Sequence, residues 1–111
     1  MSTIEFEDFL KVDIRVGRVV EVDPFPRARK PSWKLTVDLG ADLGRKRTSA
    51  QATNYSPDDL VGMQVLCVVN FEPKNIAGFL SEVLILGVPG EDGSISLLTP
   101  SRPAAAGGRV Y

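Results

Sequence analysis

Short apolar runs broken by glycine and proline most restrict how this 111-residue chain can fold. Apolar residues recur at every second position in 33–39 and along much of 13–23, which is the period of a half-buried strand. The runs at 65–69 and 83–88 are apolar throughout, so we expect both to form strands that are covered on two faces. About six short strands without a long helix predict a small, all-β fold.

Two glycine- and proline-rich regions refine this prediction. Gly17 lies in the middle of the first strand, where a residue without a side chain often marks a bend or bulge. Three prolines in 24–32 remove backbone donors and therefore predict a stiff loop. A hairpin turn is expected at 89–93. The tail after residue 99 is irregular, and its composition leaves open either disorder or an arm held by a partner subunit.

Two short helical turns are also expected. Phe6, Phe9 and Leu10 have the spacing of one turn docked on a core. Ser56 followed by a proline and two acidic residues is typical of a capped helix start at 56–60. An OB-type barrel inserts a helix at this place, between its third and fourth strands. We therefore expect the chain to form a single domain over 1–111, an OB-fold five-stranded Greek-key barrel.

Composition narrows the range of functions. The chain has no histidine, and its one cysteine, Cys67, lies in an apolar run and is expected in the core. The commonest catalytic and metal-binding residue sets are thus missing, so we expect a non-catalytic protein without metal or cofactor. A single cysteine favours a reducing compartment, and no leader or membrane-spanning segment is recognisable. These features predict a cytoplasmic protein that does not insert into a membrane.

The stretch 64–86 suggests a ligand site, because a polar loop separates two apolar strands. Asn70 and Ser81 are expected at the two strand ends, facing each other across the loop, with Lys74 adding positive charge. This arrangement suits a small polar or anionic ligand. The alternative is a purely structural turn, since Pro73 and Gly78 are ordinary turn residues.

A second signal is the excess of positive charge between residues 27 and 47, where seven Lys or Arg residues face two aspartates. Alternation along 45–51 places Arg45, Arg47, Ser49 and Gln51 on one face of a strand. Such a cluster is either a solvated face or a binding surface. As a surface for phosphates it would use four basic side chains: Lys30, Lys34, Arg45 and Arg47.

Several segments resemble a known family. Residues 10–17 and the loop 70–81 look like the tRNA-binding domain that occurs as a free dimer and attached to methionyl- and some phenylalanyl-tRNA synthetases. Segments 6–9, 24–31 and 79–84 resemble the CsaA family, free-standing homodimeric members described as export-related chaperones. The resemblance implies terminal segments used in dimerisation and one groove per subunit. Where the wider tRNA-binding group commonly has Ser-Gly-Leu, this chain has Ser-Ala-Gln at 49–51, as CsaA does. Glu72 stands where CsaA members usually have proline.

This resemblance implies a chaperone that binds unfolded or pre-export polypeptides. Binding to the tRNA elbow is the alternative, and an accessory tRNA-binding subunit of an aminoacyl-tRNA synthetase is a third. The expected ligand pocket contains Ser49, Gln51, Asn70, Phe71, Lys74, Phe79, Ser81 and Glu82. Phe71 and Phe79 would supply apolar contacts unless they pack in the core, and Glu82 is either a pocket acceptor or the partner of a nearby lysine.

Overall fold

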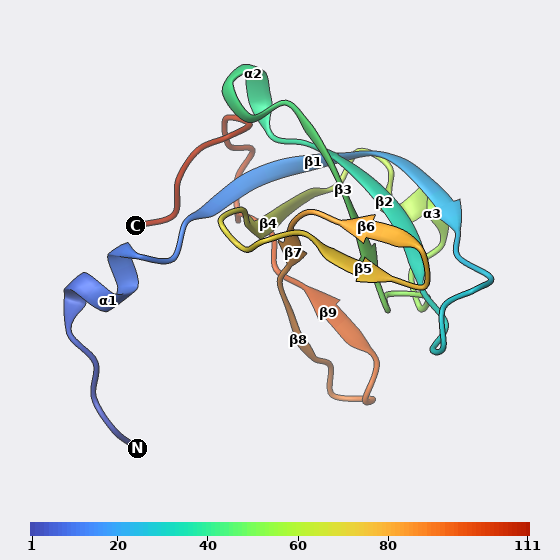
Figure 1. Cartoon of the computed structure of the whole chain (residues 1–111), viewed down its shortest axis with the longest axis horizontal. Coiled ribbons are helices and arrows are strands. Elements are labelled where there is room, and N and C mark those ends of the chain that lie inside the picture. The colour runs from blue at the N-terminus through green and yellow to red at the C-terminus, as the bar shows by residue number, and fades with distance from the viewer.

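The computed structural model describes residues 1–111, and its centre is a curled, antiparallel sheet of five strands (Figure 1). The strand order is β3-β2-β1-β4-β7. The strands are β1 (Ile14–Pro24), β2 (Trp33–Asp38), β3 (Arg45–Ala50), β4 (Gln64–Val68) and β7 (Leu84–Ile85). Because β4 returns to pair with β1 rather than β3, the connection is a Greek key. The sheet forms a nearly closed barrel, which confirms the predicted OB-type fold.

Two hairpins extend the barrel, and Figure 1 shows them as separate ribbons. The first joins β5 (Lys74–Ile76) to β6 (Phe79–Ser81) within the stretch expected to be a loop. Its two turn residues, Ala77 and Gly78, both have positive φ, as a tight hairpin turn requires. The second joins β8 (Gly87–Pro89) to β9 (Ile95–Leu97), which confirms the turn expected at 89–93.

The expected continuous strand at 83–88 is wrong. The chain pairs with β4 at Leu84 and Ile85, Leu86 still donates to the carbonyl of Leu66, and from Gly87 the chain pairs with β9 instead. Leu84 and Val88 are about half exposed rather than covered on two faces. The physical reason is the change of partner, which carries β8 away from the barrel wall.

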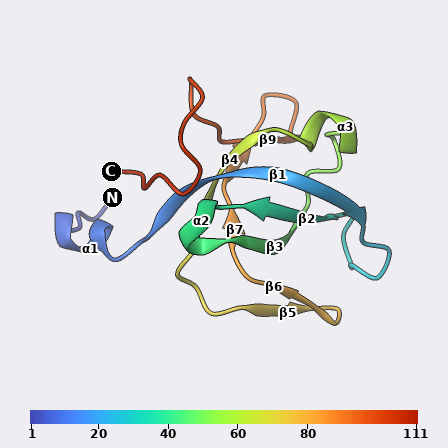
Figure 2. The ribbon, with the colours of Figure 1, turned by 90° about the horizontal axis from the view of Figure 1, so that it is seen from above.

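Three short helices complete the structure: α1 (Phe6–Leu10), α2 (Gly40–Leu43) and α3 (Pro57–Leu60). α3 begins as predicted, with the backbone N–H of Asp59 donating to Ser56 Oγ at 3.1 Å. α1 forms where it was expected, but its docking on the core is wrong. It buries no residue and lies outside the barrel in Figures 1 and 2, next to the C-terminus. No helix is long and apolar enough to span a membrane.

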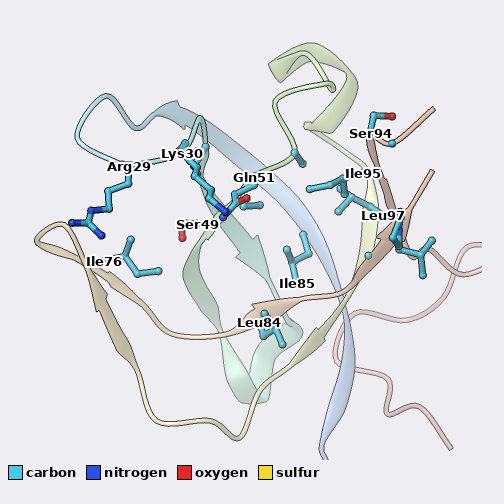
Figure 3. Close-up of a pocket in the computed structure, with 18 of the residues that line it drawn as sticks. Arg29, Lys30, Ser49, Gln51, Ile76, Leu84, Ile85, Ser94, Ile95 and Leu97 are labelled. Carbon is cyan, nitrogen blue, oxygen red and sulfur yellow. The ribbon is translucent and has the colours of Figure 1, made fainter. Parts of the chain in front are cut away.

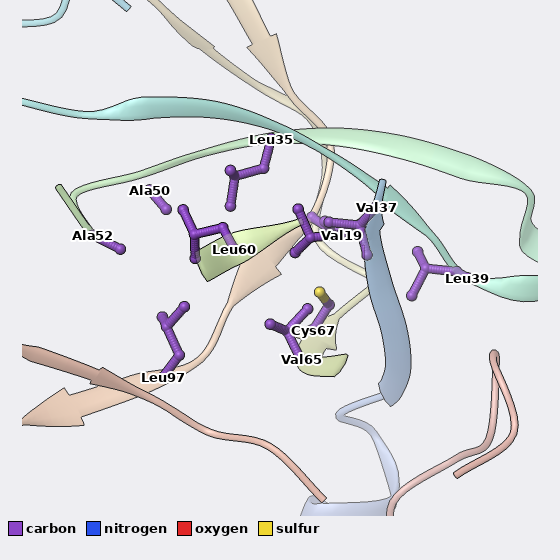
Figure 4. Close-up of a cluster of buried hydrophobic side chains, with 11 residues drawn as sticks. Val19, Leu35, Val37, Leu39, Ala50, Ala52, Leu60, Val65, Cys67 and Leu97 are labelled. Atoms are coloured by element: carbon purple, nitrogen blue, oxygen red, sulfur yellow. The ribbon is translucent and has the colours of Figure 1, made fainter. Parts of the chain in front are cut away.

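The core lies inside the curled sheet, and Leu60 of α3 is part of it (Figure 4). The alternation predicted for 33–39 is confirmed, because Leu35, Val37 and Leu39 are almost fully buried. β1 departs from simple alternation. Its register with β2 shifts between Val19 and Glu21, so the bulge lies there and not at Gly17, and Val19 points into the core.

Gly17 has a different function from the predicted bend. A Cβ atom at this position would overlap Val37 Cγ1 and lie 2.8 Å from Leu39 Cδ2. Glycine therefore lets β1 and β2 approach closely where two core side chains cross over it.

The C-terminal tail is an ordered arm on its own barrel, so the disorder left open by its composition is wrong. Gly107 donates to the carbonyl of Val16, Val16 donates to that of Gly108, and Val110 donates to that of Ile14. Both polar groups of the Gln64 side chain also bond the backbone of Ala104. The tail thus covers one edge of β1.

Candidate functional site: an apolar groove with a basic rim

The main cavity is an open groove of about 840 Å³ (Figure 3). Its walls are the 28–32 loop, the end of β3, the tip of the β5–β6 hairpin, β7 and the β8–β9 hairpin. Ten of its 19 lining residues are hydrophobic. The large apolar side chains are Ile76, Leu84, Ile85, Val88, Ile95 and Leu97. A surface of this size and composition suits apolar groups of a ligand.

Polar groups enter the groove from two places. Ser49 and Gln51 come from β3 and the residues just after it, and Figure 3 shows them apart from Ile95 and Leu97. Arg29 and Lys30 contribute positive charge from the 28–32 loop, while no aspartate or glutamate lines the groove. The site is thus apolar within and basic at one rim.

The predicted alternation of β3 is what directs these polar side chains outward. Arg45, Arg47 and Gln51 are exposed, whereas Thr48, Ala50 and Ala52 are buried. The structure therefore places the four residues predicted on one face at the barrel surface, and it brings Ser49 and Gln51 into the groove.

A smaller cavity of about 400 Å³ continues the groove and shares Ser49, Ile76 and Leu84 with it. Five of the predicted site residues line it: Ser49, Phe71, Lys74, Ser81 and Glu82. Phe71 is 56% exposed and available for contact. Glu72, the departure from the family pattern, also lies here and adds a negative charge.

Ser81 and Glu82 both hold the barrel together. Ser81 Oγ lies 3.2 Å from Thr48 Oγ1, which in turn donates to the buried carbonyl of Val83 at 2.7 Å. The Glu82 carboxylate accepts from the backbone N–H of Arg47 at 3.0 Å and lies 3.9 Å from Lys46 Nζ. Glu82 thus pairs with a nearby lysine, one of the two alternatives expected for it, while it also lines the cavity.

Asn70, expected opposite Ser81, makes its side-chain hydrogen bonds with the segment before β1. Asn70 Oδ1 accepts from the N–H of Asp13 at 3.0 Å, and its Nδ2 donates to the carbonyl of Lys11 at 2.7 Å. Because β4 pairs with β1, the end of β4 lies beside the start of β1. Asn70 therefore fastens the segment that carries α1.

Phe79 and two of the predicted phosphate-binding residues form one packed group. The Phe79 ring packs against Phe25 at 5.4 Å between centroids, and it is almost fully buried. Lys34 Nζ lies 5.2 Å from the Phe79 centroid, and Arg47 lies 4.8 Å from it and 3.7 Å from Asp23. Both cations therefore contact the Phe79 ring, although Arg47, like Lys30 and Arg45, stays exposed to solvent.

Four titratable groups have shifted pKa values, and none of them lines the groove: Asp13, Arg15, Cys67 and Asp92. Burial raises the pKa of the Cys67 thiol to about 12. The hydrogen bond from Arg15 holds the pKa of Asp13 below its ordinary value. No group of histidine, cysteine or carboxylate side chains is arranged to hold a metal ion.

Sequence reasoning missed most of the groove wall. Arg29, Val88, Ile95 and Leu97 lie outside the stretch 64–86, and the fold brings them together with Ile76 and Ile85. One local signal was available, because Val88 precedes a proline-glycine turn and so belongs to an exposed hairpin.

Comparisons with known proteins agree with this architecture. The model of a putative tRNA-binding domain matches residues 14–109. A methionine–tRNA ligase of Porphyromonas gingivalis is 42% identical over 107 residues, which cover 96% of this chain and 15% of that enzyme. The chain thus spans about a sixth of the length of the curated relatives it matches.

Two solved chaperone structures match over their whole chains. The CsaA chaperone protein of Picrophilus torridus has a TM-score of 0.94 and 46% identity, with 98% of this chain and 100% of that chain covered. Chaperone CsaA of Bacillus anthracis has a TM-score of 0.91 and 45% identity, with 99% and 100% covered.

Proposed function

Because the chain belongs to the family of putative tRNA-binding domains and resembles CsaA chaperones over their full length, we propose that it is a non-catalytic, CsaA-like binding protein. Its ligands in this proposal are unfolded or pre-export polypeptides, captured in the cytoplasm. The observation that carries the proposal is the apolar groove between β3 and the β8–β9 hairpin.

The physical argument rests on what unfolded chains expose. Apolar side chains that leave water for the groove contribute about 1.5–3 kcal/mol each when fully buried. Ile85, Ile95 and Leu97 supply an apolar floor, while Ser49 and Gln51 supply polar groups for a peptide backbone. A binding surface of this kind accepts many sequences, as a chaperone must.

Binding of tRNA is the second candidate, and the family match favours it. Exposed cations at Arg27, Arg29, Lys30, Arg45 and Lys74 would contact phosphates. Two observations favour polypeptide over tRNA. Glu72 and Glu82 line the smaller cavity, where phosphates would be repelled, and Lys34 and Arg47 are already held against Phe79.

Salt separates the two candidates. We would titrate the protein with a denatured model polypeptide and with bulk tRNA, each at about 50 and 200 mM salt, the range over which several phosphate contacts cost orders of magnitude in affinity. The proposal expects polypeptide affinity to change little between the two conditions. Saturable tRNA binding that falls steeply with salt, without polypeptide binding, would replace it.

The similarity to methionine–tRNA ligases supports a third candidate, an accessory subunit of a synthetase. This candidate expects a synthetase or tRNA to be retained when the tagged protein is isolated from cells. Recovery of neither would exclude it.

We also propose a homodimer that uses the terminal segments. Ile4, Phe6 and Leu10 are at least half exposed, and Arg109 donates to the carbonyl of Leu10, which joins α1 to the C-terminal arm. Replacing Phe6 and Leu10 together by serine should convert the protein to a monomer in sedimentation experiments. Val61→Ser removes an equally exposed apolar side chain elsewhere and should leave the dimer intact.

A further inference from the structure

The five-stranded sheet has two edges that do not pair with each other. β3 and β7 are the terminal strands in the order β3-β2-β1-β4-β7, and no ladder joins them. The groove lies between them, since Ser49 and Ala50 of β3 and Leu84 and Ile85 of β7 all line it. Unpaired strand edges carry hydrogen-bonding groups that can receive another strand.

Hydrogen bonds bridge the gap at one end only. The backbone N–H of Glu82 donates to the carbonyl of Arg47 at 2.7 Å, and the N–H of Arg47 donates to the Glu82 carboxylate. The N–H of Ser49 reaches Ser81 Oγ at 3.4 Å, which is a long and weak hydrogen bond. Arg47 and Ser49 thus direct their backbone groups to the outer edge of β3.

The alternation of inner and outer residues along β3 extends to Gln51. Ala50 and Ala52 are buried while Gln51 is exposed, so the alternation of β3 continues through these residues. Neither the backbone nor the side chain of Gln51 makes a hydrogen bond within the protein. The edge of β3 is therefore open where it borders the groove.

The positive charge at the groove rim favours extended ligands that carry an acidic residue. Arg29 and Lys30 line the groove, and no carboxylate does. A ligand with an acidic residue at the end nearest the 28–32 loop is complementary, whereas a basic residue there is repelled.

We propose that the groove binds an extended, apolar polypeptide segment with an acidic residue at one end, added as a strand to the outer edge of β3 at Ser49 and Gln51. This inference rests on the proposed capture of polypeptides and specifies its mode. Main-chain pairing gives affinity without requiring a particular sequence, and alternate side chains of the segment fall on the apolar floor formed with Ile85 and Leu97.

N-methylated peptides test the pairing. The probe is a heptapeptide with blocked termini, in which valine and serine alternate after an N-terminal glutamate. Because alternate side chains of a strand lie on the same face, its valines should all face the apolar floor of the groove. In one version the valine nitrogens carry methyl groups, and in the other the serine nitrogens carry them. In a strand, alternate N–H groups point to the same edge, so only one version removes the donors that face β3.

We expect one version to bind about tenfold more weakly than the parent peptide, and the other to stay within about threefold. Equal affinity of all three peptides, or equal loss in both versions, would overturn strand addition while polypeptide capture stands. Absence of binding by the parent peptide, together with absence of binding by denatured polypeptide, would overturn both.

A charge reversal tests the acidic preference on the protein side. The Arg29→Glu, Lys30→Glu double variant should bind a peptide with an N-terminal lysine more tightly than one with an N-terminal glutamate. The parent protein should show the opposite preference. Arg102→Glu changes an exposed arginine that does not line the groove and should keep the original preference. An unchanged preference in the double variant would overturn this part of the inference.

Discussion

Asn70→Ala distinguishes a structural function of this side chain from direct ligand contact. The substitution removes two hydrogen bonds, one to the N–H of Asp13 and one to the carbonyl of Lys11. Each contributes about 1 kcal/mol net, and both lie in an exposed part of the chain, so water replaces the lost partner. We expect the free energy of unfolding to fall by about 1–2 kcal/mol, with little change in the affinity for polypeptide.

Hydrogen exchange provides the residue-specific readout. The amide of Asp13 should lose protection in Asn70→Ala, because its acceptor is gone. Asn75→Ala is the matched control, since Asn75 is an exposed asparagine of the same stretch that accepts only from the nearby Gly78 amide. It should leave Asp13 protected. Unchanged protection of Asp13 and unchanged stability, together with a tenfold loss of ligand affinity, would refute the structural function.

Three further outcomes follow from the core and the first strand. Gly17→Ala should lower stability by about 2 kcal/mol in urea denaturation. The double variant with Val37→Ala should lose less than the sum of the two single variants, because the overlapping methyl group is absent. Cys67 should react with a thiol reagent at pH 8 only as fast as the barrel opens, because its pKa is about 12 and the side chain is buried. Asp13 stabilises the fold above its ordinary pKa of 3.8, and this stabilisation is lost as pH falls through the lower folded value. Asp13→Asn should therefore flatten the dependence of unfolding free energy on acid pH.

Local patterns predicted most of the barrel. The alternation at 33–39 and 45–52 gave the correct inner and outer faces because each depends on neighbouring residues of one strand. The cap at Ser56 was predictable for the same reason. Where pairing changes partner, local patterns are insufficient. An apolar run at 83–88 has no internal sign that Gly87 leaves β4 for β9.

The candidate site likewise contains some residues that local sequence patterns predicted correctly and others that they did not. Ser49 and Gln51 were found from strand alternation, and the groove contains both. Phe79 and Asn70 were given ligand-binding functions from residue type and position alone. Their contacts with Phe25 and Asp13 span more than 50 residues, so only the three-dimensional structure could reveal them.

The two candidate ligands share one part of the surface and differ in another. Phosphates of tRNA and the acidic end of a polypeptide would both be attracted to Arg29 and Lys30 at the rim. Only a polypeptide has side chains to place on Ile85 and Leu97, in the unpaired gap between β3 and β7. In the proposed function, the rim would therefore govern the rate of encounter for both ligands, while the apolar floor and the open edge of β3 would give a polypeptide the longer residence.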